Sequence, residues 1–261
     1  MAKKDASPQQ KSDANNSDAN KGVLSQDHLT YSMHAGYETD GVYSNAFIAR
    51  PTKGTNLPGV VLLSGMGGLT WKQREITRRY ARAGFVALSP DFMGEDQDLS
   101  TRTTRLLAKN ALDVEGTTRN IIGGAAFLHS LPWVGEKSKI GIMGFCLGGG
   151  LALLAAARSQ EFSAGIIYHQ SLFPDERELE TIQCPLQCHY GTEDHSTPKV
   201  EVDAFTKALD RMGKAYECHW YQGMGHSFAQ VEPDADIPKA QKKASDLSYQ
   251  RSFEFLHREL G

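Results

Sequence analysis

The sequence has few cysteines, no long apolar run and almost no excess of charge of either sign. Four cysteines in 261 residues are too few for a disulfide framework, which favours a reducing compartment. The sequence contains no run of about 18 apolar residues, which is the length that a membrane-spanning helix needs. The formal net charge is −3, from 28 Lys and Arg against 31 Asp and Glu, and this argues against a strongly basic nucleic-acid binder. These absences predict a cytoplasmic protein whose partners include neither nucleic acid nor membranes.

The remaining composition is that of a globular protein, with 40% hydrophobic, 9% aromatic and 23% charged residues. Residues 1–27 differ from the rest, because they are rich in Lys, Asp, Ser, Asn and Gln and contain almost no large apolar side chain. Such a segment is expected to be a disordered polar tail. We therefore expect a single compact domain over residues 28–261, as a monomer or a small homo-oligomer.

Short apolar runs alternate with longer amphipathic segments along this domain. The expected strands are 45–50, 59–64, 85–89, 139–144, 164–169, 186–190 and 216–221. The expected helices are 71–83, 112–130, 147–158, 199–212 and 240–260. Near-continuous apolar strands separated by helices predict an α/β fold, with a mostly parallel central sheet and helices on both faces. Because such sheets bind ligands at the carboxyl ends of their strands, the residues directly after each apolar run are candidates for a site.

A cysteine lies in the glycine-rich turn that follows strand 139–144, where residues 144–150 read GFCLGGG. This pattern is the G-x-nucleophile-x-G elbow with Cys146 in the position usually held by serine. The tight turn between strand and helix excludes side chains two positions before and after the nucleophile, and Gly144 and Gly148 satisfy that requirement. The following helix would direct its positive end at the sulfur and favour the thiolate. An inert, buried cysteine in an ordinary turn is the alternative.

A cysteine nucleophile needs a histidine to accept its proton and a carboxylate to orient that histidine. Strand 186–190 runs into GTEDHSTP, which offers Asp194, and strand 216–221 runs into GMGHSF, which offers His226. The resulting chain order of Cys, Asp and His is the order of α/β-hydrolases. We therefore expect Cys146, Asp194 and His226 to form a catalytic triad.

Other residues could fill the same two roles. Asp194 could instead cap the helix that follows it, which would leave Glu193 as the orienting acid. His169 ends a strand and His195 adjoins the acid, so either could be a rival base or a rim residue. His189 and His219 lie within apolar strands and are more typical of hydrogen-bonded core residues.

An oxyanion hole requires two backbone N–H groups, one from the residue after the nucleophile and one from the loop after an early strand. Leu147 would supply the first. The glycine-rich run SGMGG follows strand 59–64 and offers Gly65 or Met66 for the second, and we favour Met66. An ordinary turn is the alternative for this run.

Taken together, the stretches GFCLGGG, GTEDHSTP and GMGHSF resemble the dienelactone hydrolase family of the α/β-hydrolase superfamily. The resemblance extends from about Tyr31 to the C-terminus and includes the SPDFMG segment after strand 85–89. It implies an α/β-hydrolase fold without a large cap domain, with Cys146, His226 and Asp194 as the triad. It also implies that no metal or other cofactor is needed, and that an ester or lactone is hydrolysed through a thioester intermediate.

Two positions depart from the founding dienelactone hydrolases. Those enzymes carry a glutamate after the early strand that helps control ionisation of the thiol, and the matching position here is Gly65. They also carry an arginine shortly after the catalytic histidine that helps bind the substrate carboxylate, where this sequence has Gln230. The identity of the ester or lactone therefore stays open.

Three cations could replace that arginine. Arg102, Arg105 and Lys109 fall at positions i, i+3 and i+7 of a possible helix and could bind an anionic substrate. From the sequence alone we favour the other interpretation, a solvated basic helix face.

Two other classes of function compete with a hydrolase. A non-hydrolytic small-molecule binder could use the same fold, because fold does not fix function. Cys184 and Cys188 could suggest a thiol redox protein, but two residues this far apart along one extended strand are too distant for a disulfide. A zinc site that uses Cys188, His189, Cys218 and His219 is disfavoured because neighbouring strand residues face opposite ways.

Overall fold

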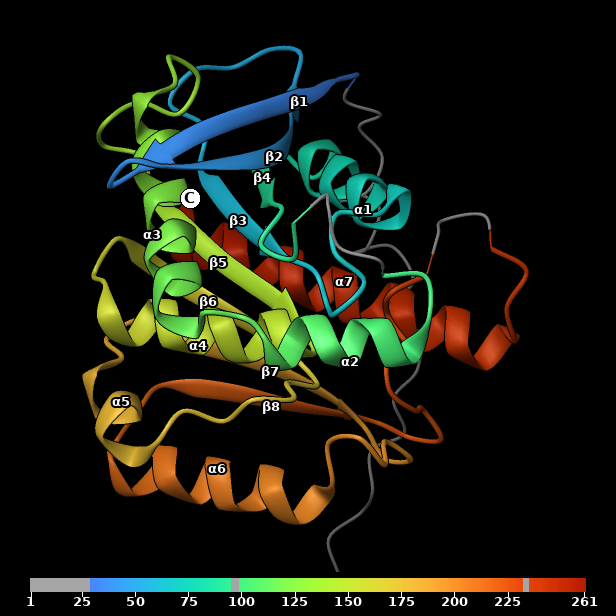
Figure 1. The fold of residues 1–261 in the computed structure, drawn as a ribbon. Coiled ribbons are helices and arrows are strands. Elements are labelled where there is room, and N and C mark those ends of the chain that lie inside the picture. The colour runs from blue at the N-terminus through green and yellow to red at the C-terminus, as the bar shows by residue number, and fades with distance from the viewer. Residues whose placement is uncertain (1–28, 95–98, 232–234) are drawn as a thin grey trace, which may run out of the picture.

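The computed structural model describes residues 29–94, 99–231 and 235–261. These residues form one eight-stranded sheet in the order β1-β2-β4-β3-β5-β6-β7-β8, with helices on both of its faces (Figure 1). β1 pairs antiparallel with β2, β2 pairs antiparallel with β4, and every other pair of neighbours is parallel. The predicted mostly parallel α/β sheet is therefore confirmed. The tail expected at residues 1–27 lies outside the described residues.

The elements follow one another as strands and crossover helices. The strands are β1 (Thr30–Thr39), β2 (Val42–Pro51), β3 (Gly59–Leu63), β4 (Val86–Pro90), β5 (Ile140–Phe145), β6 (Phe162–Tyr168), β7 (Leu186–Gly191) and β8 (Tyr216–Tyr221). The helices are α1 (Trp71–Arg82), α2 (Arg102–Asn110), α3 (Val114–Ser130), α4 (Leu147–Arg158), α5 (Glu176–Thr181), α6 (Lys199–Arg211) and α7 (Lys239–Leu260).

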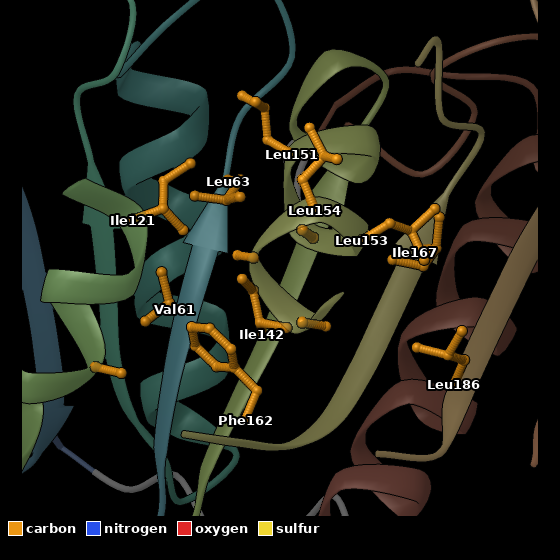
Figure 2. Packing of buried hydrophobic residues seen from close by; sticks show 14 of the residues in the cluster. Val61, Leu63, Ile121, Ile142, Leu151, Leu153, Leu154, Phe162, Ile167 and Leu186 are labelled. Carbon is orange, nitrogen blue, oxygen red and sulfur yellow. The ribbon is translucent and has the colours of Figure 1, made fainter. Parts of the chain in front are cut away.

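Two apolar layers cover the sheet because successive side chains of each strand point to opposite faces. On β3, Val61 and Leu63 pack with residues of α3 and α4 such as Ile121 and Leu151 (Figure 2). The alternate residues of β3 pack on the other face with α1 and α7. Burial on both faces explains why the inner strands are continuous apolar runs in the sequence.

Three elements were missing from the sequence prediction or uncertain in it. β1 is an edge strand of small and polar residues, most of them at least partly exposed, so no apolar run marks it. α5 has six residues, which is too short for helical periodicity to show. α2 was only a possible helix, and none of its residues is fully buried. None of the described helices is long and apolar enough to cross a membrane.

The parallel arrangement brings the ends of several strands to one edge of the sheet. Cys146 follows β5, Asp194 follows β7 and His226 follows β8. β5, β6, β7 and β8 are consecutive neighbours in the sheet, so these loops converge although they lie up to 80 residues apart in the chain. Within the described residues there is no separate cap domain over this edge.

Candidate active site

Cys146 lies at the sharp turn between β5 and α4, with φ 53° and ψ −116°. This left-handed conformation is strained for a residue other than glycine and is a feature of functional sites. A Cβ atom on Gly144 would lie 2.1 Å from the carbonyl oxygen of Gly148, and a Cβ on Gly148 would lie 2.2 Å from the carbonyl oxygen of Ser64. Both glycines are therefore required by close backbone contact, as the elbow motif predicts.

The Asp194 carboxylate orients His226. His226 Nδ1 lies 2.8 Å from Asp194 Oδ2. The other carboxylate oxygen, Oδ1, accepts hydrogen bonds from the backbone N–H groups of Ser196 at 2.8 Å and Thr197 at 3.0 Å. Asp194 is buried, whereas the alternative acid Glu193 is exposed. These bonds stabilise the turn before α6, and they leave one oxygen for the histidine.

The charges of the three groups depend on one another. Burial alone would raise the pKa of the Cys146 thiol, but hydrogen bonding and attraction to His226 lower it below its ordinary value. Burial likewise opposes protonation of His226, yet its bonds with Asp194 and Cys146 raise its pKa to about 9. The pKa of Asp194 is lowered against burial by its bond with His226. These contacts therefore shift the pair toward a thiolate beside an imidazolium, relative to the two groups in isolation.

Two backbone segments lie beside the sulfur. The N–H of Leu147, at the start of α4, interacts with the thiol of Cys146 and lowers its pKa. Met66 and Gly65, in the loop after β3, line the same cavity as Cys146. A Cβ on Gly65 would lie 3.5 Å from Cys146 Cβ, so this loop passes directly against the sulfur-bearing residue. Both segments expected to form an oxyanion hole are therefore next to Cys146.

A cavity of about 1000 Å³ opens at Cys146 and His226. Arg102, Arg105 and Lys109 line it from α2, and Gln230 lines it from the loop after His226. Within the described parts of the chain, none of the three cations has an ion-pair partner. The structure thus brings the cations of the possible helix into the same cavity as Cys146 and His226.

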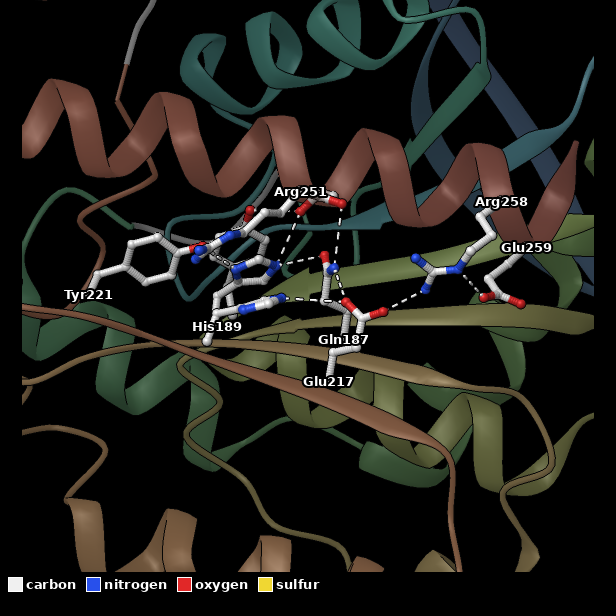
Figure 3. A network of polar contacts seen from close by, with 10 residues as sticks. Gln187, His189, Glu217, Tyr221, Arg251, Arg258 and Glu259 are labelled. Carbon is white, nitrogen blue, oxygen red and sulfur yellow. Dashed lines mark hydrogen bonds and ion pairs between the residues drawn. The ribbon is translucent and has the colours of Figure 1, made fainter. Parts of the chain in front are cut away.

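The rival histidines are placed differently from His226. His195 is exposed at the rim of the cavity. His189 is fully buried, and its ring nitrogens interact with the Tyr221 hydroxyl at 2.8 Å and the Gln187 side-chain oxygen at 2.9 Å (Figure 3). His189 is therefore a hydrogen-bonded core residue, as its strand position predicts. His169 is also buried, and its ring packs against that of His226.

The residues that could hold a metal ion overlap with the predicted triad. His169, Asp194 and His226 each offer a ligand atom, and these atoms lie within 4.8 Å of one another. Two of the three, Asp194 and His226, are already hydrogen-bonded to each other. On β7 and β8, Cys188 pairs in register with Cys218, and the ring centroids of His189 and His219 lie 5.4 Å apart with their planes tilted by 36°.

The sequence analysis did not identify one polar residue that lies near the sulfur, Ser171. Ser171 lines the cavity, and its hydroxyl helps to lower the pKa of the Cys146 thiol. Its backbone N–H donates to the carbonyl oxygen of Cys146 at 3.0 Å. Ser171 lies just beyond the carboxyl end of β6, so the rule that places sites at strand ends could have indicated it.

Comparison with known proteins identifies the family of this chain. The profile of the Dienelactone hydrolase family matches residues 44–260. A protein of a Bradyrhizobium species, named as a probable 2-oxo-3-(5-oxofuran-2-ylidene)propanoate lactonase, is 30% identical over 79% of this chain and 87% of its own length. The carboxymethylenebutenolidase of Pseudomonas putida is 25% identical over 83% of this chain and 92% of its own length.

Solved structures share the fold. A dienelactone hydrolase-like promiscuous phosphotriesterase from metagenomic libraries superposes with a TM-score of 0.75 at 21% identity, over 89% of this chain and 99% of that one. The dienelactone hydrolase of Anabaena variabilis superposes with a TM-score of 0.67 at 18% identity, over 90% of this chain and 100% of that one. The match to the family profile extends through nearly the whole of the described sheet, its helices and the loops that carry Cys146, Asp194 and His226. By that match, the chain belongs to the dienelactone hydrolase family.

Proposed function

We propose that this hydrolase cleaves a carboxylic ester or lactone through a thioester on Cys146. The observation that carries the proposal is that Cys146 and His226 line the same open cavity, with His226 hydrogen-bonded to Asp194 and lowering the pKa of the Cys146 thiol. The relatives named as a lactonase and a carboxymethylenebutenolidase support the same bond class.

In the first half of the reaction, the Cys146 thiolate attacks the carbonyl carbon and forms a carbon–sulfur bond. Negative charge develops on the carbonyl oxygen, where the backbone N–H groups of Leu147 and Met66 stabilise it. The carbon–oxygen bond to the leaving group then breaks, and the His226 imidazolium gives its proton to the departing alkoxide or enolate. The product of this half is a thioester on Cys146 and a neutral imidazole.

In the second half, the neutral His226 removes a proton from a water molecule that attacks the thioester. The carbon–sulfur bond breaks, the carboxylic acid product leaves, and the thiolate–imidazolium pair is restored. Asp194 accepts the hydrogen bond from Nδ1 throughout, which keeps Nε2 free for the proton transfers. No metal or cofactor is needed for these steps.

The substrate is an anionic ester or lactone in this proposal. Arg102, Arg105 and Lys109 lie on one side of α2 and line the cavity that contains Cys146. A carboxylate on the substrate would bind this surface by charge-assisted hydrogen bonds, which are stronger than neutral ones. The amide of Gln230, near Gly65, can add a neutral hydrogen bond.

A non-hydrolytic small-molecule binder on the same fold is the competing function. The pairing of Cys146 with His226 favours the hydrolase over the binder. A binding pocket gains nothing from a strained cysteine at a helix N-terminus beside an oriented histidine, whereas a nucleophile requires both.

The test is hydrolysis of p-nitrophenyl acetate by the wild type, by Cys146→Ala and by Cys218→Ala. We expect Cys146→Ala to lower kcat/KM by about 10³-fold or more, because it removes the nucleophile. Cys218 is a partly buried thiol on β8 outside the cavity, so Cys218→Ala should retain wild-type turnover. Wild-type rates in Cys146→Ala would overturn the proposed function.

A further inference from the structure

His169 is tied by its backbone to the loop that carries the acid. It follows β6 with φ 36°, and its N–H donates to the carbonyl oxygen of His189 at 3.0 Å. Its own carbonyl oxygen accepts from the Thr197 hydroxyl at 3.2 Å. Thr197 in turn donates its backbone N–H to Asp194. His169 is therefore held in a fixed place beside the triad.

The His169 ring lies against the ring of His226. The two ring centroids are 4.3 Å apart, and the ring planes meet at 57°. Phe145 and Phe228 surround the same ring, with centroids 6.0 Å and 6.5 Å away. His169 is fully buried, and within the described residues neither of its ring nitrogens has a hydrogen-bond partner. Burial of a polar group without a hydrogen-bond partner is unfavourable, so the presence of this side chain requires an explanation.

The charge of His169 is fixed by its neighbours. Burial, and then repulsion by protonated His226, lower the pKa of His169 to about 3, although Asp194 attracts the charged form. Tyr168 also packs close to this ring, and burial raises its pKa well above its ordinary value. His169 therefore presents a neutral aromatic ring to the His226 imidazolium. An aromatic ring close to a cation attracts it, whereas a second charged ring would repel it.

From this packing we propose that His169 is a positioning residue, whose neutral ring holds the His226 imidazole in the orientation that contacts both Asp194 and Cys146. The proposal rests on the function proposed above. Without the ring, the His226 side chain would gain space to turn away from the sulfur while its backbone stayed in place. A misplacement of about 1 Å in a catalytic group can cost roughly 10²-fold in rate.

Two substitutions at His169 distinguish the effect of the packed ring from the effect of its nitrogen atoms. His169→Asn removes the ring, and asparagine is among the residues that tolerate a positive φ. His169→Phe keeps an aromatic ring and removes both unpartnered nitrogens. A matched control is Phe205→Ala, which removes a buried ring on α6 that packs against Phe173 and does not line the cavity that contains His226.

The readouts are the thiolate absorbance of Cys146 against pH and the separate values of kcat and KM for p-nitrophenyl acetate. We expect His169→Asn to lower kcat by about 10- to 100-fold with KM within about twofold, and to move the thiolate titration to higher pH. His169→Phe should restore kcat to within about threefold of the wild type. Phe205→Ala should lower the melting temperature and leave the titration unchanged.

A wild-type kcat and titration in His169→Asn would overturn the positioning role. So would a defect in His169→Phe as large as that in His169→Asn, because the nitrogens and not the packed ring would then matter. The titration reports on the sulfur without turnover. A wild type that has the thiolate but does not hydrolyse any ester would therefore contradict the proposed function and leave the test of His169 intact.

Discussion

His226 Nδ1 and Asp194 Oδ2 lie 2.8 Å apart, and the second carboxylate oxygen is held by two backbone N–H groups. An amide at position 194 would keep the size of the side chain but could present an NH₂ group to Nδ1, which would favour the wrong histidine tautomer. We expect Asp194→Asn to lower kcat by about 10²- to 10⁴-fold, measured on p-nitrophenyl acetate.

The matched control for this substitution is Glu193→Gln, one residue earlier in the chain, whose side chain is exposed. It should leave kcat within about twofold of the wild type, since it removes a charge in the same loop without contact with the imidazole. Equal losses in both variants would show that the effect comes from the charge of the loop and not from orientation of His226.

The paired charges predict a bell-shaped pH profile for kcat/KM. Deprotonation of Cys146 sets the acid limb, and because the pKa of this thiol is lowered, activity should persist below the pH at which an ordinary thiol ionises. Loss of the His226 proton sets the alkaline limb, so activity should fall near pH 9, where the raised pKa of His226 lies. A rate that rises steadily through pH 9 would contradict the ion pair.

Alkylation by iodoacetamide checks the thiolate without any substrate. At pH 7, Cys146 should react faster than an ordinary thiol, which is only a few per cent ionised, because the pKa of Cys146 is lowered. Cys184 and Cys218 are internal controls, because burial raises the pKa of each to about 11 and should leave them unreactive. Peptide mapping of the alkylated protein identifies the modified cysteine.

The elbow predicts a large effect on stability from one added methyl group. A Cβ on Gly148 would lie 2.2 Å from a backbone oxygen, so the chain must shift to accept it. Gly148→Ala should lower the free energy of unfolding by about 3 kcal/mol or prevent folding, measured by urea denaturation. Gly67→Ala is the control, because its Cβ would meet only a methyl carbon of Thr70 at 4.0 Å. A loss below about 0.5 kcal/mol in Gly148→Ala would contradict the close packing of the turn.

The cations of α2 predict selectivity between substrates. Arg105→Gln should raise KM for an ester that carries a carboxylate by about tenfold and leave KM for a neutral ester of the same size nearly unchanged. Lys207→Gln, on α6 and outside the cavity, removes one charge as a control and should change neither value. Equal effects of Arg105→Gln on the two esters would argue against an anion-binding role for α2.

The parts of the site with local signatures could be predicted from the sequence. Gly144 and Gly148 flank the cysteine because the turn itself excludes side chains at these positions. This requirement can be recognised from a few neighbouring residues of the sequence. Asp194 and His226 could be predicted because each follows an apolar strand, and parallel strands end at one edge of a sheet.

The remaining parts depend on packing between distant segments. The direction in which α2 presents Arg105 is set by where the helix lies over the cavity, and no local pattern specifies that. The contact of His169 with His226 joins residues 57 positions apart on different loops. β1 was missed because it lies at the edge of the sheet and has no apolar run: its sequence, TYSMHAGYET, consists mostly of small and polar residues.

The most direct test is to trap the acyl group. Wild-type protein mixed with excess p-nitrophenyl acetate and quenched in acid within milliseconds should carry one added acetyl group by intact mass spectrometry. Peptide mapping should place that group on Cys146. The adduct should be absent from Cys146→Ala and present in Cys218→Ala. An acetyl group on another residue, or steady hydrolysis by Cys146→Ala, would contradict a thioester mechanism at Cys146.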